Sequence, residues 1–156
     1  MIIKNGFGFK GIYKIDAYDC LYRLVWTKEY ENIIVQNFYD AIWAYLNADT
    51  DSPAADDIEL NYFATGDGET IANISDTTLE NEIFRKQITS KSYTDSMFTC
   101  KLFLGAVESN FNIKEIGLFA NGTSTPNSGT LISRCNVDII KLDTLQYDIS
   151  YRIERV

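Results

Sequence analysis

The stretch LQYDISYRIER, residues 145–155, alternates apolar and polar side chains along its whole length. One face carries Leu145, Tyr147, Ile149, Tyr151 and Ile153, and the other carries Gln146, Asp148, Ser150, Arg152 and Glu154. In an antiparallel sheet, one face commonly packs on the core while the other meets water. The stretch therefore predicts a half-buried antiparallel strand and points to a mainly β protein.

The same two-residue period occurs near the start of the chain. In GIYKIDAYD, residues 11–19, apolar Tyr13, Ile15 and Ala17 share one face,. A turn near Asp19 and Cys20 leads into extended residues 21–35, so we predict a β-hairpin,. Further strands are expected within residues 58–66, 84–93, 96–105, 113–122 and 129–141.

Between these strands lies one segment with helical spacing. Apolar side chains recur every three or four residues from Val35 to Asn47, which predicts an amphipathic helix that packs on the sheet,. Its stripe consists of Ile34, Phe38, Ile42 and Tyr45, flanked by Val35, Tyr39, Trp43 and Leu46. We expect a single domain over residues 1–156, mainly β and antiparallel, sandwich-like, with a minor helical part. Residues 1–48 supply the hairpin and the helix packed on it, 49–57 an acidic loop, and 58–156 a β-rich core.

The charge balance narrows the classes of partner. The net charge of −8 argues against nucleic-acid binding and against adhesion to anionic membranes, both of which need clustered cations,. The start, MIIKNGFGFKG, does not have the pattern of a secretory signal, so we expect folding in a cytoplasm,. Cys20, Cys100 and Cys135 are expected to be buried, reduced thiols,.

The residue types give little support for catalysis. The chain has no histidine, which removes Ser-His and Cys-His dyads and the usual ligands of catalytic zinc, and we predict no cofactor and no metal,. We interpret the acidic loop at 49–57 as solvated rather than as a calcium site, because its spacing does not match an EF-hand,. A carboxylate pair acting on glycans remains a third-ranked hypothesis. The aromatic side chains are expected in the core or at an oligomer interface, with a sugar-stacking surface as the alternative; they are Trp26, Tyr39, Trp43 and Tyr45,.

The segment SDTTLENEIFRK, residues 75–86, has the local features of a helical turn. Ser75 or Asp76 can cap it, Thr77 and Glu80 have capping-box spacing, and Arg85 and Lys86 lie within ion-pair reach of Glu82,. Leu79 and Ile83 are expected to face the core. We assign the segment a structural role, carried by Asp76, Thr77, Glu80, Glu82 and Arg85.

The order of the segments resembles tailed-bacteriophage structural proteins of the tail-fibre and tail-collar type. The matching positions are, in order, Asn32, Ile33, Ile34 and Val35; Ala64, Thr65, Gly66 and Gly68, with Asp67 departing from the pattern; Ser75, Asp76, Thr77, Leu79, Glu80, Asn81, Glu82 and Arg85; Ile113, Glu115, Gly117, Leu118 and Phe119; and Gly129, Thr130, Leu131 and Arg134. The resemblance spans nearly the whole chain, and its central motif is the most specific.

The resemblance implies a virion protein without catalysis, cofactor or nucleic acid. We expect a component of the tail, baseplate or collar that docks on other tail, neck or baseplate proteins, is made in the host cytoplasm and is located in the virion. A homo-oligomer, trimer or hexamer, is expected. Fibres of this type often continue into a shaft and a receptor-binding tip, whereas this sequence stops at Val156, so we expect an adaptor, a collar or a short appendage. The alternative is a carbohydrate- or receptor-binding β-sandwich module.

Overall fold

The computed structural model describes residues 8–46 and 58–155, and it places nine strands and one helix in them. The elements are β1 (Phe9–Tyr18), β2 (Leu24–Ile34), α1 (Gln36–Leu46), β3 (Leu60–Gly66), β4 (Glu82–Gln87), β5 (Ser90–Tyr93), β6 (Met97–Leu104), β7 (Asn112–Ala120), β8 (Thr130–Ile140) and β9 (Gln146–Arg155). The prediction of a mainly β chain with one helix is confirmed. The acidic loop predicted at 49–57 lies outside the described residues.

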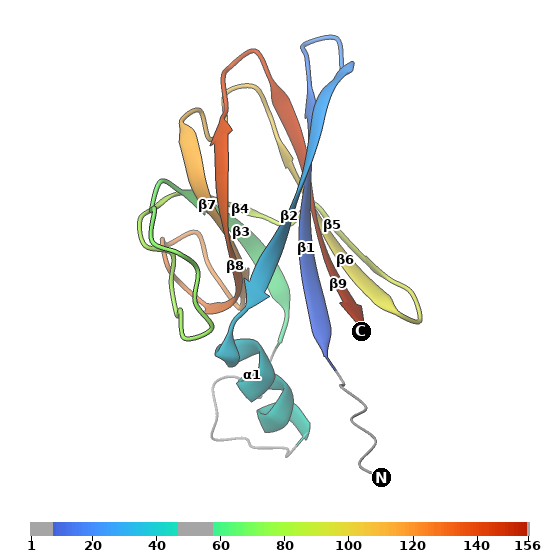
Figure 1. The fold of residues 1–156 in the computed structure, drawn as a ribbon, viewed down its shortest axis with the longest axis vertical. Helices are drawn as coiled ribbons and strands as arrows, with labels where there is room; N and C mark the ends of the chain where they lie inside the picture. The colour runs from blue at the N-terminus through green and yellow to red at the C-terminus, as the bar shows by residue number, and fades with distance from the viewer. Residues whose placement is uncertain (1–7, 47–57, 156) are drawn as a thin grey trace.

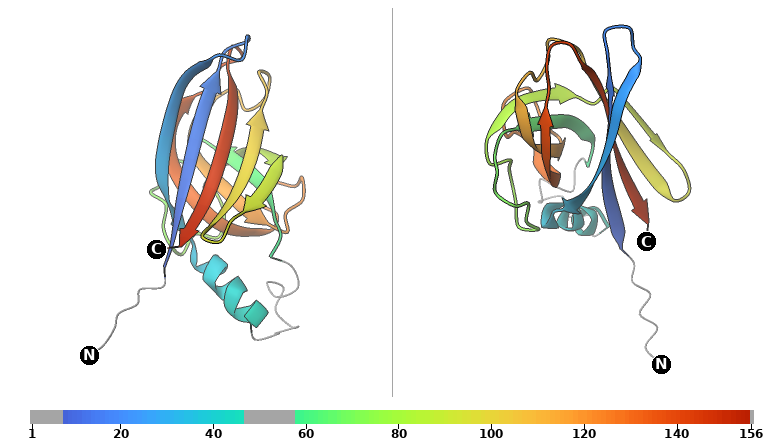
Figure 2. Two further views of the ribbon diagram at one scale, coloured as in Figure 1. Left: turned by 90° about the vertical axis from the view of Figure 1, so that its right-hand side faces the viewer. Right: turned by 45° about the horizontal axis from the view of Figure 1, so that its top comes forward.

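All nine strands belong to one antiparallel sheet that is open and curled. Their order is β4-β3-β7-β8-β2-β1-β9-β6-β5. The curl brings β1, β9, β6 and β5 opposite β3, β7 and β8, as Figures 1 and 2 show. The packing is therefore sandwich-like, but the two layers are halves of a single sheet.

Two strand segments pass from one half to the other. β2 pairs with β1 over most of its length and then reaches β8 through Ile33 and Ile34 alone. β4 and β5 lie at opposite ends of the strand order, yet only Ile88 and Thr89 separate them in the chain. The Ile88 N–H donates to the carbonyl of Asn61 beside β3, and the Thr89 N–H donates to that of Lys101 in β6. Strands that change layers in this way form the corners of a sandwich.

The core lies inside the curl, and β9 supplies a large part of it. Tyr147, Ile149 and Tyr151 are buried, which confirms the face predicted from the alternation. Across the core, the Tyr13 hydroxyl in β1 is hydrogen-bonded to the Ser133 hydroxyl in β8 at 2.7 Å. The predicted hairpin of β1 and β2 is present, and because β1 lies between β2 and β9, the hairpin shares this core with the later strands.

Helix α1 is present where predicted, but its apolar stripe is not buried as predicted. The helix lies past one end of the curled sheet, beside the start of β1 (Figure 1), and buries Phe38 and Ala41. Trp43, Tyr45 and Leu46 are exposed, Trp43 to 65%. Trp43 and Tyr45, expected in the core or at an oligomer interface, are not in the core, because α1 lies past the end of the sheet. No helix in the described parts of the chain has both the length and the apolar character needed to cross a membrane.

The three cysteines have different environments. Cys100 and Cys135 are buried as expected, and burial raises the pKa of each thiol to about 12. Cys20 is exposed, which corrects the prediction for it, because it sits in the turn of the β1–β2 hairpin rather than within a strand.

Thiol reactivity follows from this difference, since the thiolate is the reactive form. We expect a thiol reagent at pH 8 to modify one cysteine per folded chain, Cys20, and all three after unfolding. A Cys20→Ser variant serves as control and should not react while folded. Rapid labelling of Cys100 in the folded chain would contradict the packing of β6 on the core.

The contribution of the buried face of β9 to the free energy of unfolding can be measured by truncating one side chain. Ile149→Ala removes a fully buried side chain, and we expect it to lower the free energy of unfolding by about 2–5 kcal/mol in denaturant titrations,. Lys101→Ala, at an exposed position of the neighbouring strand β6, is the control and should change stability by less than about 0.5 kcal/mol,. Equal effects of the two changes would rule out the burial of this face.

Candidate functional site

The outer face of β7 and β8 carries a buried ion pair. Glu115 in β7 is fully buried, and the side chain of Arg134 in β8 is 3% exposed. The Arg134 Nε donates to Glu115 Oε2 at 2.9 Å. Charged side chains on a sheet surface normally meet water, so a second layer must cover this face.

The loop between β3 and β4, residues 67–81, provides that cover (Figure 1). The backbone N–H of Glu80 donates to Glu115 Oε2 at 3.0 Å, and that of Asn81 donates to Oε1 at 2.8 Å. Leu79 is buried and joins Phe119 and Leu131 in a small apolar cluster outside the main core. The Glu115 carboxylate thus fixes the position of the loop backbone with two hydrogen bonds.

Arg134 holds the same loop at two further points. Its Nη1 donates to Asp76 at 2.8 Å, and its Nη2 donates to the Thr70 carbonyl and hydroxyl, both at 3.0 Å. Burial by itself lowers the pKa of Arg134, but hydrogen bonds and charge from Asp76 and Glu115 outweigh it and raise the pKa overall. Arg134 is therefore a permanent cation whose donors are occupied. We call Arg134, Glu115 and Asp76 together the Glu115–Arg134 network.

Two glycines make room for this network. A Cβ on Gly68 would lie 2.5 Å from Glu115 Oε1, and one on Gly117 would lie 2.8 Å from Leu79 Cδ2. Real Cβ atoms do not approach so closely, so a side chain at either position would force Glu115 or Leu79 to move. Both glycines belong to the motifs of the family resemblance.

A second ion pair holds the loop between β7 and β8. The side chains of Arg85 and Glu82 are 4% and 1% exposed, and Arg85 Nη2 donates to Glu82 Oε2 at 2.9 Å. Arg85 Nη1 also donates to the Ser128 hydroxyl at 2.7 Å, and Glu82 accepts the Asn127 N–H at 2.9 Å. A shift in the β3–β4 register near Glu82 leaves Ile83 as an extra residue, which allows residues three apart to point the same way in a strand,.

The helical turn predicted for residues 75–86 is wrong. Residues 75–81 are irregular, and β4 begins at Glu82. The N–H groups that a helix would use are taken by Glu115, and Asp76, expected as a cap, accepts from Arg134 and from the Asn73 N–H. Hydrogen bonds to Glu115 and Arg134, which are distant in sequence, therefore override the local capping signals.

The structure confirms the predictions for some residues of this segment and contradicts those for others. Glu82 pairs with Arg85 as predicted, and Leu79 faces an apolar cluster, although one outside the main core. Ile83, expected in the core, is 49% exposed, and Thr77 is exposed outside both networks. Glu80 makes no capping box. Instead it accepts the Thr70 N–H at 2.7 Å, and this bond lowers the pKa of its carboxyl.

Lys86 and Asn136 make contacts that the sequence did not predict. Lys86 pairs with Glu108 at 2.6 Å rather than with Glu82. Asn136 was not singled out from the sequence, yet its side chain bonds the Ala72 N–H and the Thr70 carbonyl. Glu115 and Arg134 were identified only as motif positions. The available signal was a charged residue beside apolar strand residues, since a buried charge requires a partner,.

The arrangement favours a structural role over a chemical one. Every charge in the two networks is satisfied by a neighbour, which leaves no free acid or base. Within residues 8–46 and 58–155 there is no group of three His, Cys, Asp or Glu side chains placed to hold a metal ion.

Comparisons of the chain with protein-family models, with curated proteins and with solved structures gave no match.

The Glu115–Arg134 network has a direct test. Glu115→Gln removes the anion and leaves Arg134 buried beside a neutral amide, and we expect the free energy of unfolding to fall by about 3–5 kcal/mol. Lys114→Gln breaks the neighbouring, more exposed pair with Asp138 and should cost less than about 1 kcal/mol,. Denaturant titration compares the two, and a difference within error would mean that Glu115 is not the anchor of the loop.

Arg85→Ala tests the second ion pair. The change leaves Glu82 buried without its cation and frees residues 123–128 from β4, so we expect a loss of about 3 kcal/mol or more,. Arg23→Ala is the control, because the Arg23–Asp19 pair is exposed on the hairpin turn and should contribute little,. Unchanged melting of the Arg85 variant would remove the role assigned to it.

Proposed function

We propose that this chain is a non-enzymatic bacteriophage virion protein of the tail, baseplate or collar, which acts as an assembly or adaptor component for fibres. The observation that carries the proposal is the meeting of motif residues from four separate segments. Gly68, Asp76, Glu115 and Arg134 come from different motifs and lie in or against one network. The residues that carry the resemblance thus act together to fix the shape of an outer loop.

A protein that works by docking needs surface loops of fixed shape and apolar side chains left for a partner. The first requirement is met by the two ion networks. The second is met at the β1–β2 hairpin turn, where Leu21, Tyr22, Leu24 and Val25 are all more than half exposed. Apolar side chains exposed near one turn are candidates for contact with a partner.

The proposed partners are other tail, neck or baseplate proteins and further copies of the chain, as a trimer or hexamer. The location is the virion, after assembly in the host cytoplasm. The acidic character supports assembly by specific contacts, because a charge of −8 keeps copies apart until complementary surfaces meet,. Enzyme activity, a cofactor and binding to nucleic acid or membrane form no part of the proposal.

The exposed aromatic rings do not favour the carbohydrate-binding alternative. Trp43 and Tyr45 are two positions apart in α1, so their rings point to different sides and form no common platform,. Tyr18 and Tyr22 stack on each other with centroids 4.5 Å apart, which occupies one face of each ring.

The hypothesis of a glycan-cleaving carboxylate pair gains no support at Glu59. The hydrogen bond and charge of Lys91 lower the pKa of the Glu59 carboxyl, which makes it a poor general acid,.

The proposal is tested first in the particle. Mass spectrometry of purified phage, from a culture that encodes the chain, should find it in intact virions at a copy number that is a multiple of three. Its absence from virions while other tail proteins are detected would overturn the proposal.

Oligomeric state is tested on the purified chain. Light scattering behind a sizing column should give three or six times the mass of one chain,. If the hairpin turn forms the contact, Leu24→Asp should lower the mass without lowering the melting temperature, whereas Lys101→Asp, at an exposed position of β6, should leave both unchanged. A monomer at all concentrations would refute self-assembly.

A further inference from the structure

Strand β2 has an unpaired edge along most of its length. It pairs with β1 from Leu24 to Asn32, but it reaches β8 only through Ile33 and Ile34. On the side away from β1, residues 24–32 therefore have no strand partner in the part of the chain that the structure describes. An edge of this kind is a template on which another strand can pair.

Backbone donors and acceptors are available along this edge. The Glu31 carbonyl faces β8, where it accepts the thiol of Cys135 at 3.4 Å, and a thiol is a weak donor,. In an antiparallel strand the hydrogen-bonding groups of alternate residues point to the same side. Thr27 and Glu29 therefore also turn their backbone N–H and C=O groups away from β1, toward the open side of the strand.

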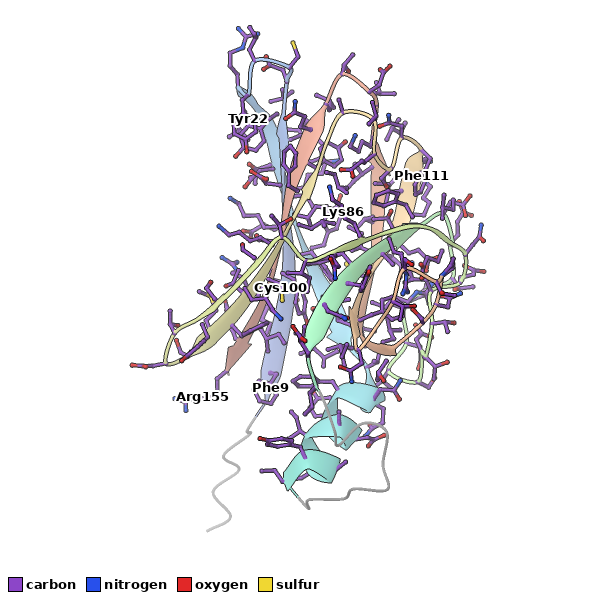
Figure 3. All side chains as sticks on the ribbon, turned by 180° about the vertical axis from the view of Figure 1, so that it is seen from behind. Phe9, Tyr22, Lys86, Cys100, Phe111 and Arg155 are labelled. Atoms are coloured by element: carbon purple, nitrogen blue, oxygen red, sulfur yellow. The ribbon has the colours of Figure 1, made fainter. Side chains whose placement is uncertain are left out.

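The edge is accessible from solvent. Leu24 and Val25 are more than half exposed, and residues 27–29 are exposed as well. Figure 3 shows Tyr22, in the turn that precedes β2, at the same end of the molecule as Phe111 but on its other side. Phe111 immediately precedes β7, so the first part of β2 stands apart from the half of the sheet that contains β7 and β8.

We propose that two copies of this chain pair through this edge, with β2 of one copy antiparallel to β2 of the other about a twofold axis. A twofold contact uses the same surface of both copies and closes on itself. The inference rests on the self-assembly proposed above and deepens it. Because a twofold contact joins two trimers into one particle of six chains, it selects the hexamer over the trimer.

Charge selects the register of this pairing. A twofold axis at Lys28 or at Glu29 sets that residue opposite its own copy, and like charges directly opposite are destabilising. An axis at Thr27 avoids both conflicts, because it sets Thr27 opposite Thr27 and Lys28 opposite Trp26 of the second copy. Pairs of Thr are favourable across strands, and a Lys over a Trp ring is a cation–π contact. Within one chain, Lys28 Nζ already lies 5.2 Å from the Trp26 ring centroid.

The same register brings opposite charges together at both ends of the contact. Arg23 of each copy comes toward Glu31 of the other, and these side chains are 72% and 76% exposed. Their present partners, Asp19 and Lys10, form surface pairs that contribute little to stability. Charged residues on an edge usually prevent pairing with foreign strands. A second β2 is a strand whose order of charges is complementary to this one.

Cysteine scanning tests the contact and its register. In a Cys20→Ser background, Thr27→Cys, Lys28→Cys and Glu29→Cys are made singly, and Lys101→Cys at an exposed position of β6 is the control for random collision. With the axis at Thr27, the two Cα atoms of residue 27 lie about 5.5 Å apart, within the range of a disulfide. Those of residue 28 are about 7–8 Å apart, and those of residue 29 about 14 Å.

Mild oxidation should link Thr27→Cys into dimers faster than the other three variants, by roughly tenfold or more. Faster dimer formation at Lys28 or Glu29 would overturn the register. Equal rates at all four positions, or no dimers, would overturn the contact.

A second measurement avoids cysteines. Thr27→Pro removes an N–H that is turned away from β1, so the pairing with β1 is kept while a hydrogen bond to the second copy is lost. Thr27→Ala retains this N–H and is the matched control, since both variants lose the hydroxyl that donates to Asp16 at 2.6 Å. Light scattering should give a lower mass for Thr27→Pro than for Thr27→Ala. Equal masses would refute the contact.

The contact and the proposed function can fail separately. Cross-linking through Thr27→Cys in a chain that is absent from virions would overturn the virion proposal and support the contact. A chain that is present in virions but gives no cross-link would overturn the twofold contact alone.

Discussion

The outer layer of this protein depends on one buried carboxylate. Glu115 stands on the face of β7 that is turned away from the main core, and it is dry only because the loop of residues 67–81 covers it. Taking an ion pair out of water costs several kcal/mol per ion, so the pair with Arg134 is a weak source of stability by itself. Its effect is to fix the position of the loop on the sheet. Only one placement of the loop gives the carboxylate its two backbone N–H donors and gives Arg134 its contacts with Asp76 and Thr70.

The two ion networks give the chain surfaces of different kinds. The half formed by β3, β7 and β8 carries loops that are held by buried charges and by glycines that permit close approach. The hairpin turn and the second half of α1 carry exposed apolar side chains, as does the loop of residues 67–81 at Ile71 and Ile74. The virion proposal rests on these two features, loops held by buried charges and apolar side chains exposed at the hairpin turn.

The sequence predicts best where the physical cause is local. The alternation of β9 is visible because one face packs on the core, and the hairpin of β1 and β2 is visible for the same reason. The limits of α1 follow from its spacing, but the exposure of Trp43 does not, since it depends on where the sheet ends. The segment at residues 75–81 misleads because its capping signals are real in isolation, whereas Glu115 and Arg134, more than thirty positions later, take up the same groups. Their partners become visible only once the sheet has formed.

The place of β9 in the sheet also affects how the chain is made. This strand lies between β1 and β6, so β1 cannot join that half until β9 has been synthesised. While the chain is still on the ribosome, β1 and β6 both present edges whose partner does not yet exist, and such edges pair readily with other chains. Folding of this half must therefore wait until β9 has been synthesised. Several nascent chains are made close together on one mRNA. The edges of β1 and β6 in one copy would therefore meet strands of other copies before their own β9 is available.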